Sequence, residues 1–77
     1  MALVNSLVRK DISRPTLHKG IEASYSLFER DGRRLLQIDS FGKKEREMPG
    51  KKSQTLQFDE EAASQLFAIL KREFGFK

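Results

Sequence analysis

The sequence predicts an α+β fold in which an antiparallel four-stranded sheet precedes one C-terminal helix (ββββα). Alternating apolar and polar residues flank an Asp31-Gly32 turn, a further alternating run spans 53–58, and a capped amphipathic stretch spans 60–74. With 77 residues the chain is close to the size at which one hydrophobic core is only marginally stable. We expect a single ββββα domain over residues 21–77 and an N-terminal arm over residues 1–20.

The first two strands are predicted from residues 22–41. An Asp-Gly pair between two strand-like runs is a strong signal for a two-residue hairpin. In the first run, EASYSLFER (22–30), one face carries Ala23, Tyr25 and Leu27 and the other carries Ser24, Ser26 and Phe28. In the second run, RRLLQIDSF (33–41), one face carries Leu36 and Ile38 and the other carries Leu35, Gln37, Asp39 and Phe41. One face of the hairpin is therefore expected to be apolar, and the other to combine polar groups with Phe41.

The other strands have weaker signals. The run KKEREMPGKK (43–52) fits a loop or a short third strand ending at Met48, because Pro49 cannot donate a hydrogen bond to a strand ladder. The run SQTLQF (53–58) alternates again. At the N-terminus, Leu3, Val4, Leu7 and Val8 have helical spacing, but an edge strand fits this segment almost as well.

Residues 59–75 carry the signals of a helix with two defined ends. Asp59 is expected to cap the N-terminus, and the two glutamates that follow it suit the positive end of the helix dipole. Gly75 is expected just after the C-terminus, where a left-handed backbone is common. The apolar stripe of this helix consists of Ala62, Ala63, Leu66, Phe67, Ile69, Leu70 and Phe74. Because capping explains the acidic cluster, we assign it no binding role.

Composition excludes or disfavours several classes of protein. The chain has no Cys, and its single histidine, His18, cannot build a multi-histidine metal site, so oligomerisation is the most available stabiliser. No motif for nucleophilic, acid–base or phosphate-cradling chemistry is present, so we expect no catalytic residue, no metal and no cofactor. No apolar run approaches the ~20 residues that span a bilayer, and no secretory signal is recognisable. We expect a cytoplasmic or nucleoid-associated protein that is neither secreted nor bound to a membrane.

Basic residues are segregated from acidic ones along the chain. The net charge is +4, and basic residues gather at 43–52 and around the Asp31-Gly32 turn, which favours an anionic partner. Single-stranded nucleic acid is held by cationic grooves and by aromatic side chains that stack on bases. The candidate nucleic-acid-binding residues are Tyr25, Arg30, Arg33, Arg34, Phe41, Lys43, Lys44, Arg46, Lys51 and Lys52. The alternative is an ordinary solvated surface with the aromatic residues packed in the core.

From Asp31 to Leu70 the chain resembles the single-stranded DNA-binding domain of the transcriptional coactivator positive cofactor four. The matching stretches are DGRRLLQIDSF, the basic stretch ending in MPGKK, an alternating strand, and DEEAASQLFAIL. The family shows the same succession of a glycine-containing hairpin, a strand ending in an aromatic residue, a basic pair after a Pro-Gly turn, a strand and a capped helix. This chain departs from the family in having no Trp and in a longer stretch between Pro49-Gly50 and the helix cap.

The resemblance implies a subunit that dimerises through its helix and offers a β surface to unpaired DNA. On this chain the helix residues implied at the dimer interface are Leu66, Phe67, Leu70 and Phe74. By position, Phe41 matches the aromatic residue at the strand end, and Lys51 and Lys52 match the basic pair. Arg33 and Arg34 lie where the family has basic residues around the first hairpin.

Two functional hypotheses follow. The first is a homodimer that binds single-stranded DNA, or RNA, with low sequence specificity and regulates transcription or replication. The second is a small regulatory adaptor that binds another protein through residues 1–12 or through the uncovered sheet face, since Leu3, Val4, Leu7 and Val8 are hard to place in the core.

Overall fold

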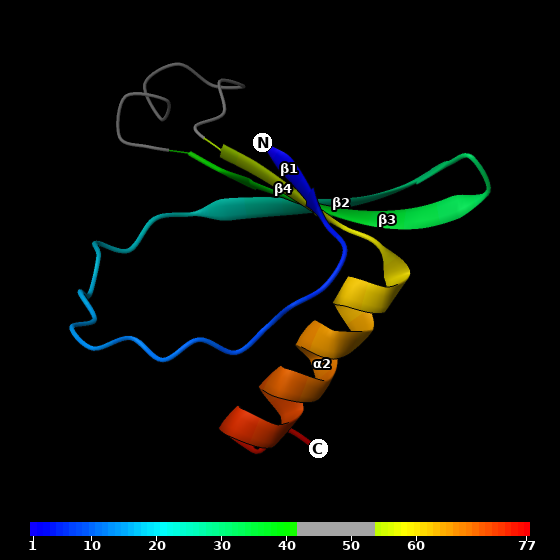
Figure 1. Cartoon of the computed structure of the whole chain (residues 1–77). Helices are drawn as coiled ribbons and strands as arrows, with labels where there is room; N and C mark the ends of the chain where they lie inside the picture. The colour runs from blue at the N-terminus through cyan, green and yellow to red at the C-terminus, as the bar shows by residue number, and fades with distance from the viewer. Residues whose placement is uncertain (42–53) are drawn as a thin grey trace.

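The computed structural model describes residues 1–41 and 54–77 and shows an α+β fold with one four-stranded sheet and one C-terminal helix (Figure 1). The elements in chain order are β1 (Ala2–Val4), β2 (Ala23–Arg30), β3 (Arg33–Ser40), β4 (Gln54–Phe58) and α2 (Glu60–Phe74). The possible short strand ending at Met48 lies outside the described residues. No helix within the described ranges is long and apolar enough to cross a membrane.

The prediction of a purely antiparallel sheet is wrong, because the sheet is mixed. The strand order is β1-β4-β3-β2; β2 and β4 pair antiparallel with β3, whereas β1 pairs parallel with β4. Of the two alternatives for the N-terminal segment, the edge strand is the one that forms. Local spacing could not show this, because the partner of Ala2 is Leu56, near the other end of the chain. A parallel partner needs a long crossover connection, and here residues 5–53 separate the two strands.

The predicted hairpin is confirmed. Arg30 pairs with Arg33, so Asp31 and Gly32 alone form the turn. Both residues have positive φ angles, 55° for Asp31 and 73° for Gly32, which is the requirement of a type I′ turn. This turn matches the twist of the flanking strands and fixes the register of β2 against β3. Every side chain of the two strands is thereby assigned to one face of the sheet.

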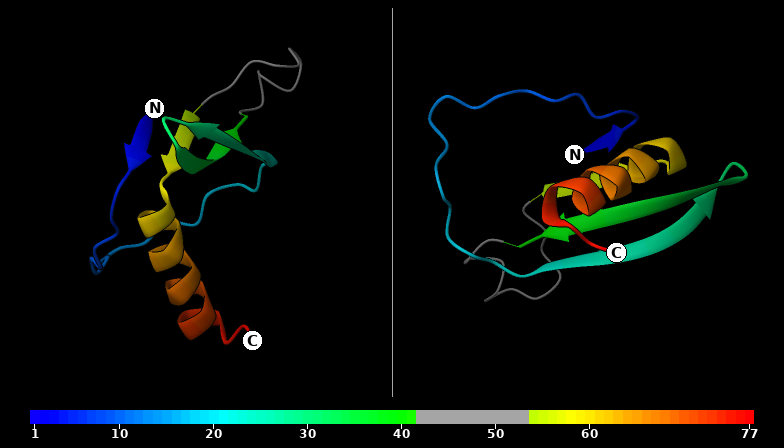
Figure 2. Two further views of the ribbon diagram at one scale, coloured as in Figure 1. Left: turned by 90° about the vertical axis from the view of Figure 1, so that its right-hand side faces the viewer. Right: turned by 90° about the horizontal axis from the view of Figure 1, so that it is seen from below.

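The two faces of the sheet differ in what covers them. Helix α2 lies on one side of the sheet (Figure 2), and a hollow between them is lined by Leu27, Leu36, Phe58 and Ala63. We call this side the helix face; its strand residues include Tyr25, Leu27, Arg34, Leu36, Ile38, Leu56 and Phe58. The opposite side is called the distal face; its strand residues include Leu3, Phe28, Arg30, Arg33, Leu35, Gln37, Asp39, Thr55 and Gln57.

Helix α2 begins and ends where the sequence predicts. The Asp59 carboxylate accepts a hydrogen bond from the Ala62 N–H at 2.8 Å, and Gly75 adopts a left-handed backbone (φ 69°) at the C-terminal end. Only the start of the helix packs on the sheet; the rest projects away from it (Figures 1 and 2). The buried apolar residues of the described ranges are Leu35, Phe58 and Ala62, which is a very small core.

The N-terminal arm is attached to the domain at several points. The Val4 carbonyl accepts from the Asp59 N–H at 3.4 Å, Asn5 Nδ2 donates to Asp59 Oδ2 at 2.8 Å, and the Leu7 N–H donates to Gln65 Oε1 at 2.7 Å. Residues 8–22 are exposed. The first part of the arm is therefore a structural element of the sheet and helix, and deleting residues 1–12 would remove strand β1.

Candidate nucleic-acid interface

The distal face carries side chains in cross-strand rows of different chemistry. The register places Arg30 beside Arg33 at the hairpin end, then Phe28 beside Leu35. The next row crosses all four strands and consists of Ser26, Gln37, Gln57 and Leu3, and beyond it lie Ser24, Asp39 and Thr55. Rows on one face are two residues apart, about 6–7 Å. Along the strands the face thus changes from cationic to apolar, then to amide, then to acidic.

The arginine row is the cationic end of this face. Arg30 and Arg33 are exposed and directly opposite each other, and neither forms an ion pair within the described ranges. Like charges directly opposite in a sheet repel each other. Arg34, the third predicted arginine, differs because it lies on the helix face opposite Glu29. A bound anion would relieve the repulsion between Arg30 and Arg33, whereas Arg34 has no like charge directly opposite it.

Two adjoining hollows lie over the distal face. One, of about 520 Å³, is lined by Leu3, Phe28, Arg30, Arg33, Leu35, Gln37 and Gln57. The other, of about 490 Å³, is lined by Met1, Ala2, Leu3, Gln37, Thr55 and Gln57. They share Leu3, Gln37 and Gln57, so they form one continuous depression from the arginine row to the N-terminal strand. A flexible chain could lie in this depression across the strands.

A hydrogen-bonded network joins the amide row to the acidic row. Thr55 Oγ1 donates to Asp39 Oδ1 at 2.6 Å, and Gln37 Nε2 donates to both carboxylate oxygens of Asp39 at 3.1 and 3.2 Å. Gln57 Nε2 then donates to Gln37 Oε1 at 3.0 Å. Asp39 is only 5% exposed, whereas Gln37 and Gln57 are partly exposed in the depression. The accessible groups of this network are therefore amides.

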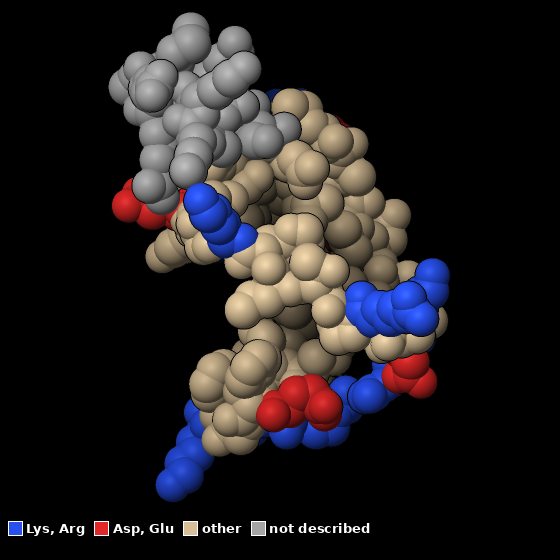
Figure 3. Space-filling model, turned by 90° about the vertical axis from the view of Figure 1, so that its left-hand side faces the viewer, with Lys and Arg blue, Asp and Glu red and all other residues tan. Residues whose placement is uncertain are grey.

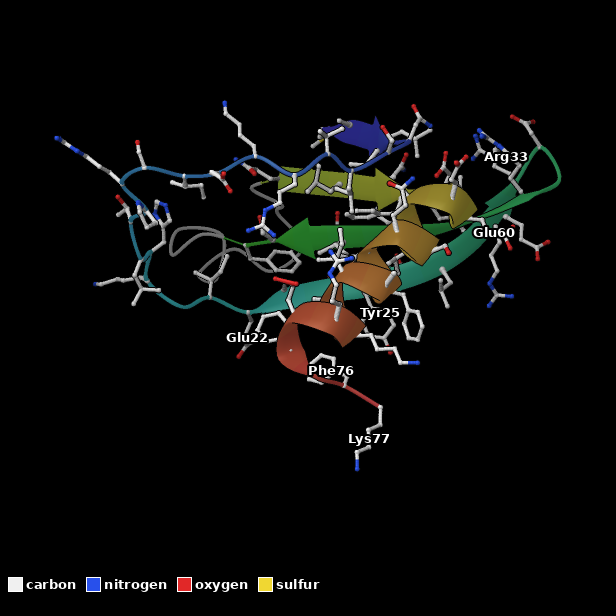
Figure 4. All side chains as sticks on the ribbon, turned by 60° about the horizontal axis from the view of Figure 1, so that its bottom comes forward. Glu22, Tyr25, Arg33, Glu60, Phe76 and Lys77 are labelled. Atoms are coloured by element: carbon white, nitrogen blue, oxygen red, sulfur yellow. The ribbon has the colours of Figure 1, made fainter. Side chains whose placement is uncertain are left out.

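The predicted binding residues do not all lie together. Arg30 and Arg33 share the distal face, and Arg33 lies at the hairpin end (Figure 4). Tyr25, like Arg34, lies on the helix face, where its side chain is exposed. Phe41 follows directly after β3 and is partly buried. The remaining predicted residues, Lys43, Lys44, Arg46, Lys51 and Lys52, lie outside the described ranges and stay predictions.

Three residues of the distal face were not predicted as site residues. Phe28, Gln37 and Gln57 line the depression, and the two glutamines have neither the positive charge nor the aromatic ring that marks a candidate nucleic-acid contact. The alternation of residues along the strands was sufficient to place the two glutamines on one face. What the sequence did not show is the register that puts Gln37 beside Gln57.

In Figure 3, which shows one side of the molecule, Lys and Arg side chains are dispersed over neutral surface and have acidic side chains near them. In the part of the chain that the structure describes, no three acidic or histidine side chains gather in a way that could hold a metal ion.

An apolar surface is left uncovered between the helix face and α2. Tyr25 is 75% exposed, Leu27 53%, Phe67 66% and Phe74 68%. Of the helix residues predicted at a dimer interface, Phe67 and Phe74 are thus largely exposed, while Leu66 and Leu70 are partly buried. Leu66 also lines a hollow with Leu7 and Val8 of the N-terminal arm. Large exposed apolar side chains gathered on one side of a small domain are typical of a contact surface.

The Asp59 carboxylate accepts hydrogen bonds from both the start of α2 and the N-terminal arm, and these bonds shift its pKa. The hydrogen bond from the Ala62 N–H, and then that from Asn5, lower the pKa of the Asp59 carboxyl from its ordinary value of 3.8. The positive charge of Arg33 lowers this pKa further, against a raising effect of partial desolvation. The charged form of Asp59 is thus favoured by the folded structure.

Comparisons with protein-family models, with curated proteins and with solved structures found no match for this chain.

Proposed function

We propose that this protein is a homodimer that binds single-stranded nucleic acid, DNA first, on the distal face of its sheet, and that it serves transcription or replication. The observation that carries the proposal is the Arg30–Arg33 pair, which forms no ion pair in the described ranges and stands at one end of an open depression. The guanidinium groups supply contacts to phosphate, and Phe28 in the neighbouring row supplies an aromatic ring for stacking. The resemblance of residues 31–70 to positive cofactor four supports the same proposal.

The exposed surface of the chain supports the homodimer. A folded monomer of this mass, 8.9 kDa, would expose roughly 4,800 Å². This chain exposes 7134 Å², an excess of roughly 2,300 Å² over that expectation. The total area includes residues outside the described ranges; within those ranges, the exposed residues 8–22 and the apolar surface around Phe67 and Phe74 contribute to the excess. A standard protein interface covers about 800 Å² per partner, so the excess leaves ample area for a second copy.

The apolar surface and the arginine pair lie on different sides of the sheet, so dimerisation and nucleic-acid binding are compatible. The uncovered apolar residues lie on the helix face and on α2, whereas the arginine pair and the amides lie on the distal face. A second copy bound at the helix face would therefore not cover the described residues of either distal face. A nucleic acid could then contact one subunit or run across both.

The neighbouring residues Arg33 and Arg34 provide a matched test. Arg33→Gln and Arg34→Gln remove the same charge at adjacent positions, but on opposite faces of the sheet. Affinity for a labelled oligo-dT should fall with salt, with a log–log slope of about −0.7 for each phosphate neutralised. Arg33→Gln should make this slope shallower by about 0.7 and weaken binding, whereas Arg34→Gln should leave both close to wild type.

Two possible results of the same titration would contradict the proposal. A wild-type protein that does not bind oligo-dT at low salt would refute the proposed function. Equal losses in Arg33→Gln and Arg34→Gln would show that net charge matters and that the distal face has no special part. Thermal unfolding of both variants, followed by circular dichroism, provides the control for folding.

A regulatory adaptor is the second candidate, and one observation favours it. Val8, Ile12 and Leu17 are apolar side chains of the N-terminal arm that stay exposed, Leu17 almost completely. A protein partner could cover them. Residues 1–7 include strand β1 and are bonded to the domain, so Val8→Ser with Ile12→Ser is a cleaner probe than deletion of the arm. An adaptor with these two substitutions should lose its partner, while binding of oligo-dT should not change.

A further inference from the structure

The amide row of the distal face has a fixed orientation, and that orientation can be derived from chemistry. A carboxylate accepts hydrogen bonds and cannot donate them, so Gln37 must turn its NH₂ group toward Asp39. The Gln37 carbonyl oxygen then points to Gln57, which must turn its own NH₂ group toward Gln37. Thr55 donates to Asp39 from β4 and holds the carboxylate in place. Asp39 therefore sets the orientation of both amides.

This series of hydrogen bonds ends at Gln57, whose remaining polar groups are available to a ligand. Gln57 Oε1 accepts no hydrogen bond from the described residues, and the Gln57 NH₂ group uses one contact, to Gln37. Gln57 is partly exposed and lines both hollows of the distal face. The Gln57 amide thus presents an acceptor and a donor side by side to the depression. Gln37 holds this amide in place, and the buried Asp39 carboxylate holds Gln37.

We propose that Gln57 binds the edge of an unpaired nucleobase, and that Asp39 is a positioning residue acting through Gln37. This inference rests on the proposed function and names a base-contacting subsite within it. An oriented amide forms two hydrogen bonds with a base edge that presents a donor next to an acceptor. In a duplex the Watson–Crick edges are occupied, so such a contact favours single strands. Every base offers such a pair on its Watson–Crick edge, but adenine offers a second one at N6 and N7 that thymine lacks, so we expect oligo-dA to be preferred over oligo-dT.

The position of the row agrees with a base contact. Gln37 and Gln57 lie two rows, about 13 Å, from the arginine pair, with Phe28 and Leu35 between them. Phosphate contacts, a stacking surface and a base-edge contact therefore follow one another on the same face.

Gln57→Leu and Gln54→Leu form the matched pair of variants that tests the base contact. Both residues are in β4, but Gln54 pairs with Ser40 and lies on the helix face. The measurement is fluorescence anisotropy with three labelled strands of equal length, oligo-dA, oligo-dT and an abasic deoxyribose-phosphate strand. Wild type should bind oligo-dA more tightly than the abasic strand. Gln57→Leu should reduce this affinity ratio about fivefold or more, with the salt slope unchanged, while Gln54→Leu should change neither.

Asp39→Asn tests the positioning role. Asparagine can donate to Gln37 Oε1, which would allow both amides to turn over and present the opposite pattern to the base. The ratio between oligo-dA and oligo-dT should then change, although a purely structural role would lower affinity for all strands alike. A Gln57→Leu ratio equal to wild type, or wild-type binding of the abasic strand as tight as that of oligo-dA, overturns the base contact but leaves phosphate binding intact. Absence of binding to any strand overturns the proposed function as well.

Discussion

Replacing Phe67 by alanine measures how much free energy the uncovered side of α2 contributes to the proposed association of two copies. An aromatic side chain buries about 150–250 Å², and 66% of Phe67 is exposed, so roughly 100–160 Å² remains for a partner to cover. At about 25 cal/mol per Å² this corresponds to about 2.5–4 kcal/mol. Allowing for the Cβ atom that alanine keeps and for incomplete cover, about 2 kcal/mol is lost per side chain.

In a two-fold dimer the residue counts twice, so the loss is about 4 kcal/mol, or roughly a thousandfold in the dimer Kd. Folding of the single chain should be nearly unaffected, since Phe67 is exposed and alanine has the best helix propensity. Sedimentation equilibrium over a range of concentrations measures the Kd. Leu17→Ala is the control, because Leu17 is 99% exposed but lies outside the helix. A wild-type chain that stays monomeric, or a Phe67→Ala chain with the wild-type Kd, would refute the reasoning.

Three further outcomes are expected. Asp59→Ala removes the cap on the Ala62 N–H and should lower the midpoint of thermal unfolding more than Glu60→Ala, which removes an acidic side chain from the first turn but leaves the cap. Because hydrogen bonds lower the pKa of Asp59 in the folded chain, its stabilising effect is present above its ordinary pKa of 3.8 and is lost as pH falls through the folded-state value. The unfolding midpoints of the two variants should therefore converge toward wild type below that pH. A difference between the midpoints that stays constant with pH would contradict a capping charge. Lys51→Glu with Lys52→Glu should weaken oligonucleotide binding without changing the unfolding midpoint, and unchanged affinity would remove both lysines from the interface.

The parts of the fold that depend on neighbouring residues could be predicted from the sequence. The Asp31-Gly32 turn, the Asp59 cap and the end of α2 at Gly75 are local signals, and each is found in the structure. Strand β1 has only three residues, too few for a period, and its stability comes from a partner near the other end of the chain. Its parallel direction therefore could not be predicted from residues 1–20.

The candidate site was predictable only in part for a related reason. Residue type indicated Arg30, Arg33 and Arg34 equally, and only the register of the hairpin separates Arg34 from the other two. Gln37 and Gln57 carry no charge or ring that would mark them, and their value depends on hydrogen bonds to each other and to Asp39. Such a property belongs to the arrangement of the side chains, so composition and spacing do not reveal it.

The parallel pairing of β1 with β4 also determines when the domain can be completed during synthesis. A β-hairpin forms in ~1–10 μs, so β2 and β3 can pair as soon as both have emerged from the ribosome. Asn5 and Asp59 are 54 positions apart, which at ~5–20 residues per second is a wait of roughly 3–11 s. Throughout that interval residues 2–4 have no strand to join. Leu3 reaches the distal face only after Gln57 is made, so the depression on that face is finished in one of the last steps of folding.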